Sequence, residues 1–370
     1  MMTRRERISR CYFSQEVDRP AVYSRTGFPD GDPTYDRLRN HLVAYTELKS
    51  SWPGAKFESK QAVEVSVEPY SEDFRRRIEI LHTPKGTLRR SFLASLKGQP
   101  GLHETSFINS AADAEKYLSL PIPQIGGDVS SFFVADAEIG EKGIVDVGLG
   151  LNAGGFVADL CGSESFALMS VTNRELIHCL CERRMNIILG LVKFLLSAGV
   201  GPFFSMLGQE YIVPPLHGPR DFHDFNVRYD KPVVDLVHEA GGRMHIHCHG
   251  SVKEVFQGFI DMGADVLHPF EPPPLGNILP HEAKERARDR MCLEGNIQIH
   301  RMYEATPDEI SDETQRLITD AFDDGKGLIV CPTASPYIRG KGEDCFPQYK
   351  AMIDAVLRFG GDSSEAGLAS

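Results

Sequence analysis

The sequence lacks the cysteine patterns of disulfide scaffolds and zinc fingers. Its eight cysteines are scattered over 370 residues, without a CxxC pair. A secreted disulfide-rich protein would be shorter and denser in cysteine, so free thiols in a reducing compartment are expected. The longest apolar run, 185–200, is too short to cross a bilayer, and the arginine-rich start has no apolar signal-peptide segment. We therefore expect a cytoplasmic protein without membrane association.

Excess positive charge is also absent. The formal net charge is −12, whereas proteins that bind a phosphate backbone carry clustered Lys and Arg. This excludes nucleic acid as the expected partner. No GxGxxG motif or P-loop follows a predicted strand, which disfavours an open, doubly wound nucleotide-binding sheet.

A regular alternation of strands and helices begins at residue 172. With 41% hydrophobic residues, the chain can bury one large core. Five strands alternate with helices in this half, which predicts a parallel sheet, and the earlier strands bring the count near eight. A (β/α)8 TIM barrel is therefore the expected fold, with a doubly wound sheet as the alternative. Helix-capping boxes are expected at Thr172 with Glu175, Ser251 with Glu254, and Thr306 with Glu309.

The first part of the chain is less regular than the second. We expect one barrel domain over 1–360, in which 1–150 holds an irregular elaboration inserted near the start of the barrel and 151–360 is the regular part. Turn residues between 75–81 and 87–96 predict a hairpin inside the elaboration. The small polar segment 361–370 is expected to be a flexible tail.

Three histidines alternate along one predicted strand. His245, His247 and His249 share one side of it, because successive strand residues point to opposite faces. The next strand brings His268 and Glu271 to its exit. Two imidazoles with a carboxylate from the neighbouring strand indicate a metal site, whereas a single histidine at a strand end is more often structural.

Each of these side chains also has a structural interpretation. His245, deeper in the strand, is expected to be a core histidine held by a buried partner, and Cys248 to pack as a small hydrophobe. Glu271 and Glu210 would be solvated loop carboxylates, and Arg25 would pair with an acidic neighbour. At the carboxyl ends of barrel strands, however, such residues are typical of an active site.

Four short motifs resemble the uroporphyrinogen decarboxylase superfamily. They are Val-Asp-Arg-Pro at 17–20, Ala-Gly at 240–241 before the histidine strand, Gly-Ala-Asp at 263–265 and Gly-Asn-Ile at 295–297. The superfamily is a (β/α)8 barrel that includes the decarboxylase of haem synthesis and the cobalamin-dependent methyltransferases. The resemblance therefore implies the same barrel and one of these two activities.

The methyltransferase branch implies zinc, held by His-x-Cys on one strand and a Cys near the last. His247 matches the first ligand, His249 stands where the family has its first Cys, Cys331 lies just before the place of the second, and Glu271 could complete the set. Whether Cys331 or His268 ligates the ion stays open. The catalytic residues expected at other strand ends are Arg25, Glu210 and Asn296.

The function expected first is zinc-dependent transfer of a methyl group between a corrinoid or small methylated donor and a thiol-type acceptor. Because the chain shows no cobalamin-binding module, cobalamin would sit on a separate corrinoid protein. Uroporphyrinogen decarboxylase activity is the main alternative, although Arg25 replaces a loop with two arginines and Phe28 stands where the second would be. A metal hydrolase and a non-catalytic binding protein are further alternatives, and assembly as a homodimer is left open.

Overall fold

Eight parallel strands form a curled sheet at the centre of the molecule. The structure is a computed structural model that describes residues 2–58, 63–97 and 101–359, so the predicted tail at 361–370 lies outside the described residues. Along the sheet the strand order is β1-β12-β11-β10-β9-β8-β7-β2, which confirms the expected (β/α)8 type of fold. The strands are β1 Ala21–Val22, β2 Leu48–Pro53, β7 Gly143–Leu151, β8 Phe203–Leu207, β9 Arg243–His247, β10 Val266–His268, β11 Cys292–Ile297 and β12 Leu328–Pro332.

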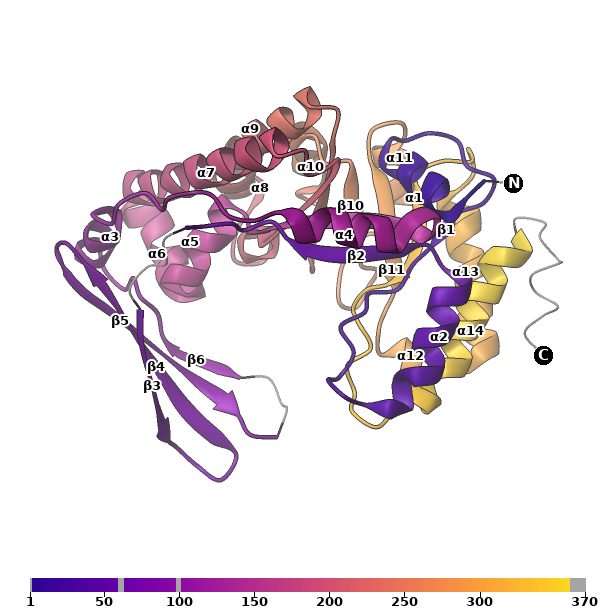
Figure 1. The fold of residues 1–370 in the computed structure, drawn as a ribbon, viewed down its shortest axis with the longest axis horizontal. Helices are drawn as coiled ribbons and strands as arrows, with labels where there is room; N and C mark the ends of the chain where they lie inside the picture. The colour runs from indigo at the N-terminus through magenta and orange to yellow at the C-terminus, as the bar shows by residue number, and fades with distance from the viewer. Residues whose placement is uncertain (1, 59–62, 98–100, 360–370) are drawn as a thin grey trace.

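Helices connect consecutive strands and surround the sheet (Figure 1). None of those in the described part of the chain combines the length and apolar character that a membrane crossing requires. The helices are α1 Arg4–Tyr12, η1 Pro33–Tyr35, α2 Asp36–Tyr45, α3 Ala111–Leu118, α4 Ser130–Ile139, η2 Gly140–Lys142, α5 Ala153–Cys161, α6 Ser163–Thr172, α7 Arg174–Ser197, η3 Gln209–Ile212, α8 Pro219–Phe222, the π-helix η4 His223–Val227, α9 Arg228–Glu239, α10 Phe256–Met262, α11 Pro280–Ala287, α12 Arg301–Glu304, α13 Pro307–Ala321 and α14 Gly342–Phe359.

A second, antiparallel sheet is inserted between β2 and β7. Its four strands run in the order β3-β4-β5-β6 and project away from the barrel (Figure 1). The predicted hairpin is confirmed as β4 and β5. Leu81 and Leu88 at the base of the sheet pack with buried residues of α3 and α5 to α7, so the projecting sheet is anchored at one end. The bounds are β3 Val63–Pro69, β4 Phe74–Thr83, β5 Gly86–Ser95 and β6 Leu102–Thr105.

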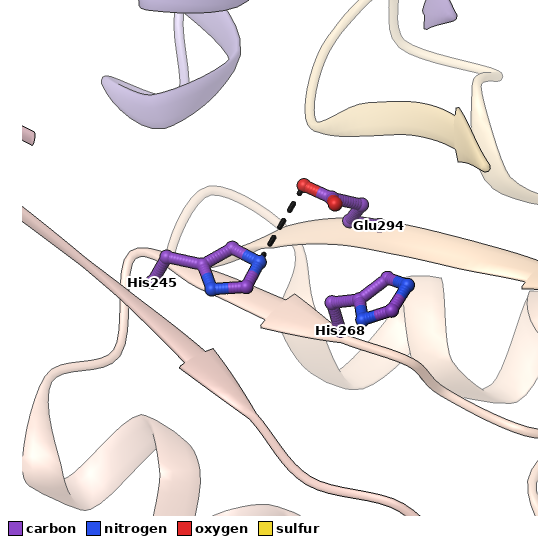
Figure 2. A group of neighbouring side chains, drawn as sticks. All are labelled: His245, His268 and Glu294. Carbon is purple, nitrogen blue, oxygen red and sulfur yellow. Dashed lines mark ion pairs between the residues drawn. The ribbon is translucent and has the colours of Figure 1, made fainter. Parts of the chain in front are cut away.

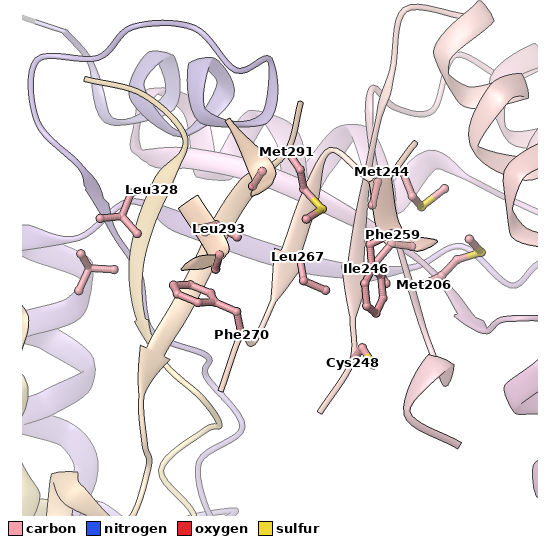
Figure 3. Close-up of a cluster of buried hydrophobic side chains, with 14 of the residues drawn as sticks. Met206, Met244, Ile246, Cys248, Phe259, Leu267, Phe270, Met291, Leu293 and Leu328 are labelled. Carbon is pink, nitrogen blue, oxygen red and sulfur yellow. The ribbon is translucent and has the colours of Figure 1, made fainter. Parts of the chain in front are cut away.

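The main core lies between the barrel strands and their helices. On β9, Met244 and Ile246 belong to this apolar layer (Figure 3), while His245 and His247 line the interior. On β11, Leu293 joins the same layer and Glu294 the interior. The alternation along each strand therefore separates an apolar outer layer from a polar interior.

Helix α1 closes the amino-terminal end of the barrel. Ile8, Cys11 and Tyr12 are buried against the inward residues at the start of the strands, among them Phe203 and Val266. This apolar plug separates the polar interior from solvent on that side.

A buried carboxylate joins the two strands at the ends of the sheet order. One Glu47 oxygen accepts hydrogen bonds from Arg7 at 2.7 Å and Arg19 at 3.0 Å, and the other accepts from the backbone N–H of Val22 at 2.7 Å. The N–H of Glu47 donates to the carbonyl of Val22 at 3.0 Å. Since Val22 is in β1 and Glu47 directly precedes β2, this cluster holds the seam of the barrel.

The capping predictions had different outcomes. Thr306 and Glu309 form the expected box at α13. The box at Ser251 was wrong, because the Glu254 carboxylate accepts a hydrogen bond from Asn277 and the helix begins only at Phe256. The box at Thr172 was also wrong, since α7 begins after Asn173 without a side-chain cap.

Asp230 lies at the centre of a buried polar network beneath the ends of β7 and β8. Its Oδ2 accepts hydrogen bonds from the side chains of Asn152 at 2.8 Å and Gln209 at 2.9 Å. Burial raises the pKa of Asp230 to about 7, against the opposing effect of these bonds. Because Gln209 directly precedes Glu210, the network fixes the start of the loop that carries this acid.

We expect Glu47→Ala to lower the free energy of unfolding by about 3–5 kcal/mol, because the buried Arg19 would lose its carboxylate partner and Arg7 would keep only Asp18. Chemical denaturation measures this change. The matched control is Glu343→Ala, which removes an exposed partner of Arg37 and should cost less than about 1 kcal/mol. Equal effects of the two substitutions would show that the seam does not depend on Glu47.

We expect Asp230→Asn to flatten the pH dependence of stability. In the native protein the pKa of Asp230 is about 7, above the value of about 3.9 in an unfolded chain. The unfolded state therefore releases its proton first, and the native protein loses stability as pH rises from about 4 through 7. Unfolding midpoints from pH 4 to 8 measure this loss. A variant that loses stability over this range as steeply as the parent would contradict the assignment.

Candidate functional site

The interior of the barrel opens into a polar cavity of about 400 Å³. Its wall comes from five of the strands and from the segments that follow β1 and β12. The lining residues are Tyr23, Arg25, Thr26, Gly27, Lys49, Ser51, Asp146, Gly148, Ser205, Met206, Leu207, His245, His247, Glu294 and Ser335.

A buried ion pair lies deep in this cavity. The ammonium of Lys49 on β2 contacts the carboxylate of Glu294 on β11, and both side chains are almost completely buried. Burial disfavours the charged carboxylate, but Lys49 and then His245 overcome this effect and hold the pKa of Glu294 well below its usual range. His245 Nε2 lies 3.6 Å from Glu294, which makes Glu294 the buried partner nearest to this histidine.

Arg25 contacts two histidines that lie nearer the mouth of the barrel than the Lys49–Glu294 pair. Its Nη1 lies 2.9 Å from Nδ1 of His247 and 3.4 Å from Nδ1 of His268, and the two Nδ1 atoms are 2.9 Å apart. His268 Nε2 is 3.2 Å from the carbonyl of Pro332, which can only accept, so Nε2 carries the proton and Nδ1 a lone pair. Nη1 has two hydrogens and can donate one to each histidine. Burial, reinforced by His268 and Arg25, holds the pKa of His247 far below normal, which keeps its ring neutral.

His249 and Glu271 meet at the mouth of the barrel. His249 Nδ1 lies 3.3 Å from Oε2 of Glu271, and the buried Glu271 also accepts a hydrogen bond from the N–H of Gly250 at 2.8 Å. The rings of His247 and His249 are 4.7 Å apart and perpendicular. Burial raises the pKa of the nearby Glu210, against the opposing effects of its hydrogen bonds and His249. Two imidazoles and two acids therefore gather where β8, β9 and β10 end.

The four predicted metal ligands fall into two groups in this structure. His247, His249 and Glu271 lie together at the mouth, whereas Cys331 is fully buried with its Sγ 3.9 Å from His268 Nε2. The Cys331 thiol donates to the carbonyl of Pro332, and burial raises its pKa.

Within the described ranges, one set of three His, Cys, Asp or Glu side chains has its ligand atoms within 4.8 Å of one another, and it is different from the predicted one. It consists of His245, His268 and Glu294.

The predicted catalytic residues also differ in position. Arg25 lines the cavity, and Glu210 lies beside the mouth histidines. Asn296 is buried on β11, and its Nδ2 has no hydrogen-bond partner among the described residues.

Sequence reasoning missed three charged residues of the interior, which are Lys49, Asp146 and Glu294. For Asp146 and Glu294 the available signal was a charged residue inside an otherwise apolar strand, because acids are almost never buried without a partner. Lys49 lies in the more polar strand β2, where no such signal exists.

The mouth residues suit a zinc ion chemically. Two imidazoles and a carboxylate form a donor set found in catalytic zinc sites, which leave a fourth position for water or substrate. The carboxylate near His249 also matches the usual pairing of a metal-binding histidine with an acid. The ligand atoms of His247, His249 and Glu271 do not all lie within 4.8 Å of one another, so the side chains would have to move to share one ion.

Comparisons with known proteins agree with the fold. Residues 157–335 match the family model described as uroporphyrinogen decarboxylase (URO-D). The structure is similar to that of a methyltransferase from Methanosarcina mazei, with a TM-score of 0.61 and 14% sequence identity over 97% of this chain and 99% of that chain. A B12-independent methionine synthase from Shewanella sp. W3-18-1 has a TM-score of 0.44 and 13% identity over 65% of this chain and 70% of that chain. No curated protein matches the sequence.

At 14% identity the likeness to the Methanosarcina protein shows a shared fold and does not extend to its reaction. The family model covers the part of the chain that carries the histidine strand and the Gly-Ala-Asp and Gly-Asn-Ile motifs. The matched region and the motifs make this part of the chain similar to the uroporphyrinogen decarboxylase family, and the barrel agrees with that likeness.

Proposed function

We propose that this protein is a zinc-dependent methyltransferase that moves a methyl group between a corrinoid or small methylated donor and a thiol-type acceptor. The observation that supports the proposal is the group at the mouth of the barrel, in which His249 lies 3.3 Å from the buried Glu271 and packs against His247. We propose these three residues as the zinc ligands. Cys331 stays a predicted ligand, since it would have to lose its proton and turn from the Pro332 carbonyl to join them.

Zinc bound at the mouth would supply Lewis acidity, which lowers the pKa of a coordinated thiol. The protein residues around it would position the reactants. Arg25, at the edge of the cavity, would hold an anionic end of the donor or acceptor, because a guanidinium binds carboxylates and phosphates through paired hydrogen bonds. Glu210, with its raised pKa, would donate or accept a proton beside His249. Asn296 would offer its unpaired amide N–H.

The charges of the cavity argue against a porphyrinogen as substrate. A substrate with many carboxylates needs several free cations. Arg25 and Lys49 are the cations that line this cavity, and Lys49 is already paired with Glu294. Asp146 adds another acid to the same wall. Decarboxylation of a porphyrinogen therefore remains the less favoured candidate.

A corrinoid donor would come from a separate protein. Within the described ranges, the chain consists of the barrel and the projecting antiparallel sheet, and neither resembles a cobalamin-binding module. We propose that the partner presents its cofactor at the open end of the cavity, beside His247 and Arg25.

We expect His249→Ala to weaken zinc binding by more than about 10-fold, because loss of a direct ligand should exceed the lower limit for loss of an outer-shell partner. Competition with a chromogenic chelator measures the affinity. His223→Ala is the matched control, since this histidine is exposed and contacts none of the mouth residues. Unchanged zinc affinity in His249→Ala would remove His249 from the ligand set.

We expect Glu210→Gln and Arg25→Ala to lower kcat for methyl transfer about 10- to 100-fold at saturating zinc, because misplaced reactants lose the advantage of ordered positioning. Zinc affinity should change much less. The assay follows methylcobalamin and simple thiols, and Glu285→Gln, an exposed acid on α11, is the control. Full activity in both variants would show that these residues are structural. Release of carbon dioxide from a porphyrinogen by a parent protein that methylates no thiol would replace the proposal with the decarboxylase.

A further inference from the structure

A second group of metal-ligating side chains lies deeper in the barrel than the mouth residues. His245, His268 and Glu294 come from the adjacent strands β9, β10 and β11, and all three are buried. Figure 2 shows the two rings and the carboxylate facing a common space. One ligand atom from each lies within 4.8 Å of the other two, so small side-chain rotations would bring all three onto one ion.

The two histidines present lone pairs to this space. Because the Pro332 carbonyl accepts the proton on Nε2 of His268, Nδ1 of that ring is left as an acceptor. A backbone carbonyl on the second ring nitrogen is the usual way in which a metal-binding histidine is oriented. His245 is 6% exposed, and neither of its ring nitrogens hydrogen-bonds to any described residue. Its charged neighbour, Glu294, lies 3.6 Å away, beyond hydrogen-bond length. A buried imidazole without a hydrogen bond is costly, which points to a ligand that binds between the two side chains.

Two cations now contact these groups. Lys49 contacts Glu294, and Arg25 lies 3.4 Å from Nδ1 of His268. A divalent ion would have to displace Lys49 from the carboxylate and Arg25 from Nδ1 of His268. Asp146 offers Lys49 another partner, because it lines the same cavity and its Oδ1 is buried with no hydrogen bond to a described residue. The rings of Tyr23 and Tyr12, at 4.7 and 5.3 Å from the ammonium, can hold the lysine in either position.

We propose that His245, His268 and Glu294 form an inner site for a divalent transition-metal ion, separate from the mouth ligands His247, His249 and Glu271. Two imidazoles and one carboxylate suit zinc or ferrous iron and leave coordination positions open. His245 and Glu294 both line the cavity, so the open positions face the space in which a substrate would bind. Lys49 acts as a competing cation that occupies the carboxylate when the metal is absent.

The test is metal stoichiometry and affinity with Zn²⁺, and absorption spectroscopy with Co²⁺, on the full chain. The parent should bind two equivalents. His245→Leu should lose one, and without metal it should still unfold in a cooperative transition, because it removes only the 3.6 Å contact with Glu294 and Lys49 still pairs with that carboxylate. His41→Leu is the matched control, since Nε2 of this half-buried histidine of α2 also lacks a partner, and it should keep both equivalents.

Lys49→Met should bind the inner ion more tightly than the parent, by 10-fold or more, because the competing cation is gone. Should His245→Leu fail to fold, the double variant Lys49→Met, Glu294→Gln removes the ligand and its counterion together and should lose the same equivalent.

The results separate this site from the one proposed at the mouth. If His249→Ala loses one equivalent and His245→Leu loses the other, both sites stand. If only His245→Leu loses metal, the inner site stands and the mouth set fails. Full stoichiometry with an unchanged Co²⁺ spectrum in His245→Leu overturns the inner site, as does a parent that binds no metal.

Discussion

The buried pair of Lys49 and Glu294 is the interaction on which the interior of this barrel depends. An isolated charge at that depth would lose its hydration without compensation. Together the two residues allow opposite walls of the barrel, β2 and β11, to carry ionised groups in a largely apolar scaffold. The two opposite charges cancel, and the polar cavity with its neutral histidines depends on this cancellation.

The barrel divides its polar residues into two levels. The inner level contains groups from the middle of the strands, which the outer apolar layer holds rigidly. The mouth contains His249, Glu271 and Glu210, which follow the strand ends and depend on loops. The Asp230 network under Gln209 shows how one loop is fixed, because a buried carboxylate collects donors from two strand ends. Ligands on strands at the inner level and ligands on loops at the mouth are together suited to binding an ion while admitting a reactant.

Local sequence patterns predicted the barrel well where periodicity is strong. The alternation correctly placed His245 and His247 on one strand, but β9 ends at His247 and His249 follows it. Ile246 and Cys248, which lie between the histidines, pack outward as expected. Pairing across the barrel was beyond such reasoning. Lys49 and Glu294 are 245 residues apart, and no local pattern shows that they meet. The same limit explains Cys331, whose position near the last strand was correct but whose thiol lies beside His268. The predicted cap at Ser251 was wrong because the Glu254 carboxylate accepts a hydrogen bond from Asn277, which lies in a later loop.

The plug formed by α1 has a kinetic consequence. Tyr12 and its neighbours close the amino-terminal end of the barrel, so the cavity has its opening at the carboxyl ends of the strands. Molecules that enter and leave through one opening leave in the reverse order of arrival. A reactant seated against the deep wall would therefore be trapped until whatever sits above it departs, so the order of release would follow from the shape of the chamber.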